Sequence, residues 1–337
     1  MSHSEVIAKV TSRTDLSLEE MAAAIDQMME GAWSDDDIGA LLLALNEKGP
    51  SVDEIAGAAT AMRKHMVKIA SPSEKFIDTC GTGGDRSGTF NISTATALVI
   101  AAAGVTVAKH GNRSVTSKSG SADVLSRLGV NIEADVPTIE KCLNEVGICF
   151  CFAPLMHSSM KHVAPVRKKL GVPTIFNLLG PLCNPANAPF QLLGVGKPEY
   201  RELLASALQK LGTTKAVFVT GRDGMDEVTI SDATDVTIAT PGGTVPIVWQ
   251  PEEFGIERQG KEDMLVDGPE ESAAMIRSVL AGKKGGARDI VVINAAAALW
   301  TLGKNDSLSE CARLAEIAID GGAAEETLAK LAEVSHA

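Results

Sequence analysis

The sequence predicts an α/β protein in which a helical bundle is followed by a parallel or mixed sheet covered by helices. Its 337 residues exceed what one ordinary hydrophobic core holds, and this length favours two domains. Residues 1–70 carry repeated helix-start signals and no strand pattern. From residue 75, short β-rich runs alternate with helical stretches, which is the pattern of a sheet packed against helices.

The N-terminal helices are predicted from one signature that occurs three times. A serine is followed three residues later by Glu or Asp, and then by apolar residues at helical spacing, as in a capping box. The three pairs are Ser17 with Glu20, Ser34 with Asp37, and Ser51 with Glu54. Gly31 and Gly49 end the first two helices, and connections this short make neighbouring helices antiparallel.

The sheet is predicted from five β-rich runs, each with a helical stretch before the next. The runs are Phe76–Cys80, Val105–Ala108, Ile148–Phe152, Gln191–Val195 and Ala216–Thr220. Residues 158–189 interrupt the alternation with several prolines and a basic stretch, which suggests a crossing point between domains. From Pro269 onward the chain is predicted to be mainly helical.

The overall charge disfavours nucleic acid and membranes as partners. Asp and Glu outnumber Lys and Arg by 43 to 31, and the resulting net charge of −12 repels phosphate backbones and anionic lipids. Aromatic residues make up 4% of the chain, too few for a platform that stacks single-stranded bases. Residues 86–122 and 146–198 nevertheless contain no carboxylate side chain, so we expect a locally positive cleft in an acidic exterior.

Three further features favour a cytoplasmic protein without a membrane segment. The first ten residues have neither the basic start nor the apolar stretch of a secretory signal. The longest apolar run, residues 95–108, is interrupted by Thr and Gly and is shorter than the roughly 20 residues that span a bilayer. The 6 cysteines form no C-x-x-C pair and have no histidine at zinc-ligand spacing, which favours reduced thiols.

A glycine-rich turn directly after the first strand is the first candidate site. Residues 81–85 read Gly-Thr-Gly-Gly-Asp, and Asn91-Ile92-Ser93-Thr94 then open an apolar helix. Glycines let the backbone approach an anion, and the free N–H groups of a helix start favour phosphate. The sequence matches neither a Walker A loop nor a dinucleotide fingerprint, and a tight, capped strand-to-helix turn is the alternative.

A polar loop after the second strand is the second candidate. Residues 109–121 hold two lysines, one arginine and five hydroxyl side chains, which can bind phosphate oxygens through charge-assisted hydrogen bonds. A solvated loop is the alternative, and His110 by itself also fits a structural histidine.

Two more segments offer charged groups. Asp226 and Glu227 end an acidic turn at 221–227, where adjacent carboxylates can share Mg²⁺ together with substrate phosphates; an acidic surface turn is the alternative. His157 precedes the basic stretch 161–169, in which Arg167 is the single arginine and could bind a substrate carboxylate. A basic, solvent-facing helix explains that stretch equally well.

Together these segments closely resemble the anthranilate phosphoribosyltransferase family, whose enzymes join anthranilate to phosphoribosyl pyrophosphate (PRPP). The resemblance rests on five motifs in the family's order and spacing. They are D-x-x-GTGGD at 78–85, NIST at 91–94, KHGNRSVTSKSGSADVL at 109–125, KHVAPVRKKLGVPTIFNLLGPLCNPA at 161–186 and GxDGMDE at 221–227.

The resemblance implies a more detailed fold than the residues alone. It predicts an α/β protein with a small all-helical domain hinged to a larger α/β domain, whose mixed, mainly parallel sheet is covered by helices. The small domain would comprise residues 1–70 and a returning segment near 165–190, and the large domain residues 71–164 and 191–337. Family members are typically homodimers, so a homodimer is expected.

The resemblance also implies site residues. It places PRPP on Gly81, Gly84, Asp85, Thr89, Asn91, Ile92, Ser93, Thr94, Lys109, His110, Gly111, Asn112, Arg113, Ser114, Val115, Thr116, Ser117 and Ser121. It places magnesium on Ser93, Asp226 and Glu227, with two ions expected per subunit, one of them accompanying PRPP. Anthranilate would contact Gly81, Asn112 and Arg167, with His157 and Gly180 lining its approach.

The implied reaction is the second step of tryptophan biosynthesis from chorismate. The amino group of anthranilate would displace pyrophosphate from the anomeric carbon of PRPP, giving N-(5-phosphoribosyl)anthranilate, with no general base assigned. Two alternatives are a nucleoside phosphorylase of the same fold, which would not need the Asp226–Glu227 pair, and a non-catalytic nucleic-acid binder, which would be basic overall. The sequence does not determine feedback control or association with anthranilate synthase components.

Overall fold

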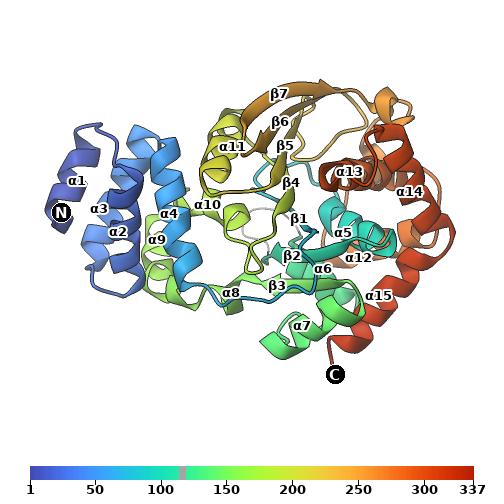
Figure 1. The fold of residues 1–337 in the computed structure, drawn as a ribbon, viewed down its shortest axis with the longest axis horizontal. Helices are drawn as coiled ribbons and strands as arrows, with labels where there is room; N and C mark the ends of the chain where they lie inside the picture. Colours follow the sequence, from blue (N-terminus) through green and yellow to red (C-terminus); the bar gives the residue numbers. More distant parts are fainter. Residues whose placement is uncertain (114–118) are drawn as a thin grey trace.

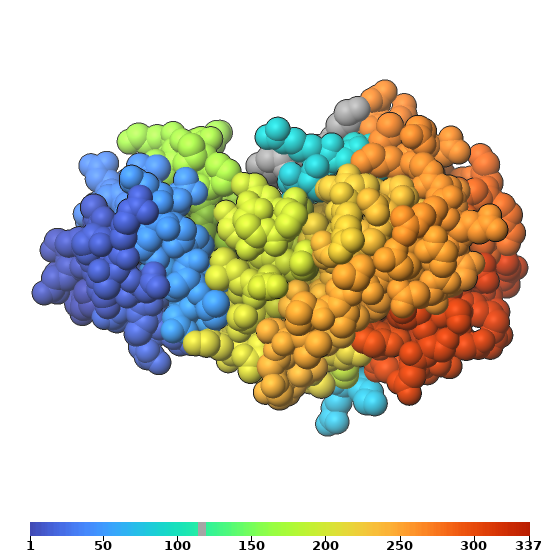
Figure 2. All heavy atoms as spheres, turned by 90° about the horizontal axis from the view of Figure 1, so that it is seen from above, coloured from blue at the N-terminus to red at the C-terminus, as the bar shows by residue number. Residues whose placement is uncertain are grey.

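A computed structural model describes residues 1–113 and 119–337. A bundle of helices forms one end of the molecule (Figures 1 and 2). A seven-stranded sheet with its covering helices forms the rest (Figure 1). This arrangement confirms the predicted fold class. In the described part of the chain, no helix combines the length and the apolar character needed to cross a membrane.

Four helices form the N-terminal part of the bundle: α1 (His3–Thr11), α2 (Leu18–Met29), α3 (Asp35–Lys48) and α4 (Val52–His65). The three predicted helix starts are confirmed, because the side chains of Ser17, Ser34 and Ser51 each accept a hydrogen bond from the backbone N–H three residues on. Such a cap typically stabilises a helix by about 1 kcal/mol. Helix α1 was not predicted, although Ser2 and Glu5 form the same capping box.

The sheet has the order β3-β2-β1-β4-β5-β6-β7. Its strands are β1 (Phe76–Gly81), β2 (Thr106–Gly111), β3 (Ile148–Phe152), β4 (Phe190–Gly194), β5 (Lys215–Gly221), β6 (Thr234–Thr240) and β7 (Gly243–Trp249). The first five are parallel, and β6 and β7 continue the sheet antiparallel. All five predicted strands are present, whereas β6 and β7 were not predicted.

Eleven further α-helices are described. They are α5 (Ile92–Ala102), α6 (Ser121–Arg127), α7 (Val136–Glu145), α8 (Ala153–Met156), α9 (Ala164–Leu170), α10 (Phe176–Leu179), α11 (Arg201–Lys210), α12 (Pro269–Leu280), α13 (Gly286–Leu302), α14 (Leu308–Asp320) and α15 (Ala323–Val334). The last four confirm that the C-terminal part is mainly helical.

The two faces of the sheet bury different hydrophobic clusters. Successive residues of a strand point to opposite faces. In β5, Val217 and Val219 pack in the cluster that contains α5 and α13, whereas Ala216 and Phe218 pack with α11 and the bundle. The bundle core therefore continues onto one face of the sheet.

A mid-chain segment also packs into the bundle. Val163, Val166, Phe176 and Leu179 belong to the same buried cluster as the four N-terminal helices, and α9 lies beside them in Figure 1. The chain thus passes between bundle and sheet more than once.

The chain segments that connect the bundle to the sheet are tied together by backbone hydrogen bonds. Val67 N–H donates to the Met156 carbonyl at 2.8 Å, and Ile69 N–H donates to the Pro185 carbonyl at 3.1 Å.

Candidate active site

The candidate site lies where β1 and β4 end side by side. After β1 the chain continues to β2 and β3 on one side, whereas β4 and β5 lie on the other. Gly81 and Gly194, the last residues of β1 and β4, are register partners. In open parallel sheets, ligands bind in the crevice outside the carboxyl ends of the strands at such a switch point.

The glycine-rich turn after β1 is held against the end of β4. Thr82 N–H donates to the Gly194 carbonyl at 2.9 Å, and Gly196 N–H donates to Thr82 Oγ1 at 3.0 Å. Gly83 and Gly84 have φ values of 64° and 85°, a left-handed conformation that glycine adopts without strain. The backbone at 83–84 is exposed and open to an anion.

The acidic turn after β5 meets this glycine-rich turn directly. Gly83 N–H donates to Asp226 Oδ2 at 3.1 Å, and Asp226 N–H donates to Asp85 Oδ2 at 3.5 Å. Gly194 allows the approach, because a Cβ there would lie 1.7 Å from the Asp226 carbonyl oxygen. Asp85 therefore lies beside the carboxylate pair, a proximity that the sequence did not indicate.

The surroundings of Asp226 and Glu227 disfavour the charged form of both carboxyl groups. Burial, followed by the charge and hydrogen bond of Asp85, raises the pKa of Asp226 to about 8. Burial and the charge of Asp226 raise the pKa of Glu227 above its ordinary value, although Lys109 opposes this rise. Crowded carboxylates beside a hydroxyl are hard oxygen donors that fit Mg²⁺, which usually takes one or two carboxylates plus waters and substrate phosphates.

Lys109 and Ser93 complete this side of the cleft. Lys109 is buried, and its Nζ donates to the Thr79 carbonyl at 2.6 Å and to Ser93 Oγ at 3.3 Å. The backbone N–H of Ser93, in the first turn of α5, donates to the Glu227 carboxyl and lowers its pKa. Ser93, Lys109 and Glu227 thus come together from three separate segments. Burial lowers the pKa of Lys109, while the charges of Asp78 and Glu227 raise it.

The other residues predicted at the start of α5 have different environments. Ile92 is buried in the core, so its side chain is not open to a ligand. Thr94 is buried and donates to Asn91 Oδ1, whose amide donates to the Ser119 carbonyl. Thr89 is half-buried and forms a β-bridge with Leu265.

The loop after β2 is described at both of its ends. Gly111 closes β2, and Ser121 Oγ donates to the Asn112 carbonyl, which fixes the start of α6 against the loop. Arg113 pairs with Asp123 at 3.2 Å and lies 5.7 Å from the centre of the Phe152 ring. The predicted contacts Ser114, Val115, Thr116 and Ser117 lie outside the described residues.

His157 and Gly180, which were expected to line the approach of anthranilate, are connected through His110, which was expected to bind PRPP. His110 Nδ1 is 3.2 Å from the Gly180 carbonyl oxygen, and His110 Nε2 is 3.3 Å from His157 Nε2. Burial lowers the pKa of His110 to about 3 and that of His157 to about 4, so both are neutral at pH 7. A neutral histidine can donate from one ring nitrogen and accept at the other, which suits this chain of contacts.

Arg167 lies apart from this connected group. Its Nη2 donates to Asn177 Oδ1 at 3.3 Å, and its Cζ lies 5.5 Å from the centre of the Phe176 ring. None of its described contacts is with Gly81 or Asn112. Within the described residues, His110 thus links His157 to Gly180, whereas Arg167 contacts none of the other residues expected to bind anthranilate.

Two buried polar residues beneath the site were not singled out from the sequence. Asp78 accepts hydrogen bonds from His110 N–H at 3.1 Å and from Asn184 Nδ2 at 2.8 Å, and Asn184 Nδ2 also donates to the Ala108 carbonyl. They fix β1, β2 and the segment before β4 relative to one another. The signals in the sequence were a carboxylate within an apolar strand and the place of both residues in the quoted family motifs.

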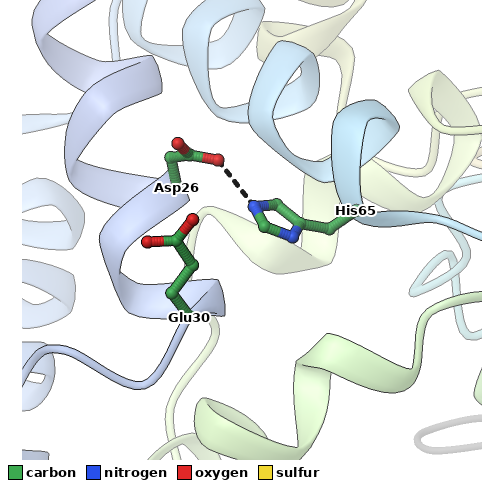
Figure 3. Close-up of side chains that lie close together, drawn as sticks. All are labelled: Asp26, Glu30 and His65. Carbon is green, nitrogen blue, oxygen red and sulfur yellow. Dashed lines mark hydrogen bonds and ion pairs between the residues drawn. The ribbon is translucent and has the colours of Figure 1, made fainter.

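A separate polar cluster lies in the bundle. In the described part of the chain, Asp26, Glu30 and His65 are the one group of three His, Cys, Asp or Glu residues spaced to hold a metal ion (Figure 3). Lys64 Nζ already bonds both Asp26 oxygens, at 2.9 and 2.7 Å. The cluster joins α2 to the end of α4 and makes none of the site contacts described above.

Comparison with known proteins covers nearly the whole chain. Residues 4–66 match the helical bundle domain of the glycosyl transferase family, and residues 73–325 match its a/b domain. The anthranilate phosphoribosyltransferase of Rhodopirellula baltica is 47% identical over 333 residues, which cover 99% of this chain and 97% of that protein.

Two solved structures have the same fold. The anthranilate phosphoribosyltransferase from Thermus thermophilus superimposes with a TM-score of 0.91 at 39% identity, covering 98% of this chain and 99% of that one. The enzyme from Saccharomyces cerevisiae, in complex with PRPP and Mg, gives 0.89 at 28% identity, covering 99% and 98%. The chain therefore belongs to the anthranilate phosphoribosyltransferase family.

Proposed function

We propose that the cleft at the carboxyl ends of β1, β4 and β5 transfers the phosphoribosyl group of PRPP to the amino group of anthranilate, giving N-(5-phosphoribosyl)anthranilate and pyrophosphate. The observation that carries this proposal is the 3.1 Å hydrogen bond from Gly83 N–H to Asp226. It joins an anion-binding turn to a carboxylate pair suited to Mg²⁺, and a donor substrate with a pyrophosphate group needs both.

The glycine-rich turn, the start of α5 and the loop after β2 would hold PRPP. Gly81, Gly84, Asp85, Thr89, Asn91, Ile92, Ser93, Thr94, Lys109, His110, Gly111, Asn112, Arg113 and Ser121 are the described members of this set. Because Ile92 is buried and Gly83–Gly84 are exposed, the backbone rather than the Ile92 side chain would contact phosphate. Lys109 would place a positive charge beneath the leaving pyrophosphate.

Ser93, Asp226 and Glu227 would hold Mg²⁺, and the family resemblance suggests two ions per subunit. When bound, the ion would neutralise charge that develops on the leaving pyrophosphate. The chain's own part is to place these oxygens beside the anion-binding turn, and Asp85 lies close enough to contribute.

Anthranilate would bind with its carboxylate on Arg167 and Asn112, near Gly81, His157 and Gly180. Arg167 has no carboxylate partner among the described residues, so its guanidinium is available to a bidentate ligand. Neutral His110 and His157 are too weakly basic to act as strong general bases. An arylamine has a free lone pair, so these residues would position it for attack rather than deprotonate it.

Closure between the domains would complete the site. The small domain would comprise residues 1–70 and the returning segment 165–190, which carries Arg167, and the large domain residues 71–164 and 191–337. Rotation about the segments that connect the bundle to the sheet would bring Arg167 toward Asn112 and exclude water from PRPP. We further propose a homodimer located in the cytoplasm.

The reaction itself provides the test. The protein is mixed with PRPP, anthranilate and Mg²⁺, and the loss of anthranilate fluorescence is followed, with magnesium omitted as the control. Loss that requires all three supports the proposal. Folded protein that leaves the fluorescence unchanged, but cleaves a nucleoside in the presence of inorganic phosphate, would favour a nucleoside phosphorylase instead.

A further inference from the structure

A cavity of about 570 Å³ lies at the amino ends of the strands, whereas the candidate active site lies at their carboxyl ends. It is lined by the end of α4 and the residue Lys68, by the end of α11, and by residues 187–189 and 212–213. Pro189 and Thr213 stand just before β4 and β5, so the cavity lies at the amino ends of these strands. The length of β4, roughly 16 Å at the usual rise per residue, separates it from the candidate active site.

The cavity is basic. Arg63, Lys64 and Lys68 line it, and none of its described lining residues is acidic. Lys64 is balanced by Asp26, which also lies 2.6 Å from His65 (Figure 3). Arg63 and Lys68 have no carboxylate partner in the described part of the chain, so two positive charges remain unbalanced beside the cavity.

Arg63 is held in a fixed position. Its Nε donates to the Leu182 carbonyl at 2.7 Å, which ties the end of α4 to the segment before β4. This is the one hydrogen bond that the Arg63 side chain makes within the described residues, so both terminal nitrogens are left for a ligand. Burial lowers the pKa of Arg63, which indicates that its charge is partly removed from water. A fixed, partly desolvated guanidinium favours a bidentate oxyanion.

The rest of the lining is mixed: Ala188, Pro189, Leu208 and Leu211 are apolar, and Thr60, Asn187 and Thr213 add hydroxyl and amide groups. A volume of about 570 Å³ falls within the range of small-molecule sites. We infer that this cavity is a second ligand site, which binds a small organic carboxylate with an apolar body. Its occupant would contact Lys68, which lies between α4 and β1, and also residues 187–189, which directly precede β4.

Direct binding tests the inference independently of the transferase reaction. Hexanoate is titrated into the full chain by isothermal titration calorimetry, with uncharged hexanamide as the control ligand. We expect one saturable hexanoate site per chain. Arg63→Gln should weaken hexanoate binding about tenfold or more, as expected when a charge-assisted hydrogen bond is lost. Lys68→Gln, at an exposed position, should weaken it less while preserving the Arg63–Leu182 bond.

Two matched variants control for location and charge. Lys304→Gln removes one positive charge that does not line the cavity, and Arg167→Ala removes the proposed anthranilate contact; neither should change hexanoate binding. The inference is overturned if hexanoate does not saturate, if hexanamide binds equally well, or if Arg167→Ala abolishes binding while Arg63→Gln and Lys68→Gln do not. Tighter binding of inorganic phosphate than of hexanoate would contradict the choice of an apolar carboxylate.

Discussion

Replacing Arg167 with alanine should weaken the binding of anthranilate selectively. In the structure the guanidinium has a single 3.3 Å hydrogen bond to Asn177 and lies over the Phe176 ring, with no carboxylate partner in the described chain. A bidentate bond to a substrate carboxylate would be lost in Arg167→Ala, at a cost of about 2–3 kcal/mol. That cost corresponds to a rise of about 30- to 150-fold in the KM for anthranilate.

Steady-state fluorescence measures this change, with anthranilate varied at saturating PRPP and PRPP varied at saturating anthranilate. The KM for PRPP should change little, because the proposed PRPP contacts lie on β1, α5 and the loop after β2. Lys168→Ala, at the exposed neighbouring position, is the matched control and should change neither KM. Equal increases in the two KM values for Arg167→Ala would refute the assignment.

Three further predictions concern the carboxylate pair, the close approach at Gly194 and the two histidines. Changing Asp226 and Glu227 together to alanine should abolish magnesium-dependent turnover, and a magnesium titration with an unchanged rate would remove the metal role. Gly194→Ala should lower the Tm and the activity, because its Cβ would lie 1.7 Å from a backbone oxygen of Asp226; a melting curve identical to wild type would show that the backbone shifts at no cost. His110 and His157 have pKa values of about 3 and 4, below the unfolded value, so the unfolded state binds more protons as the pH falls below about 6.5. The free energy of unfolding should therefore fall from pH 6.5 toward pH 4, by on the order of 2 kcal/mol per histidine at pH 5. Chemical denaturation at a series of pH values measures this fall, which should be shallower in a variant with both histidines changed to asparagine.

The features predictable from sequence were those set by local chemistry. Ser17, Ser34 and Ser51 cap helices because the acceptor and the N–H group are three residues apart, and β3 was predicted with its observed bounds. Strands β6 and β7 were missed, although they flank a Pro-Gly turn at 241–242. Their outer, partly exposed position at the sheet edge gives a weaker hydrophobic pattern than the buried parallel strands have.

The site was predictable as a set of segments but not as a set of contacts. Strand order decides that Asp226 meets Gly83, because β5 follows β4, which pairs with β1. The contact between His110 and His157, 47 residues apart, depends on how the chain returns past β2. Sequence motifs identify which residues have useful chemistry, whereas topology decides which of them touch.

The contribution of residues 163–182 to the bundle core has a consequence for how the chain folds while it is being synthesised. Helices α1–α4 are complete at His65, yet Val163 and Phe176 fill part of their shared cluster. At a synthesis rate of about 5–20 residues per second, about 5–20 s pass before those side chains follow. During this interval the nascent helices expose the apolar surface that the later segment will cover, and this surface is a natural place for a chaperone to bind.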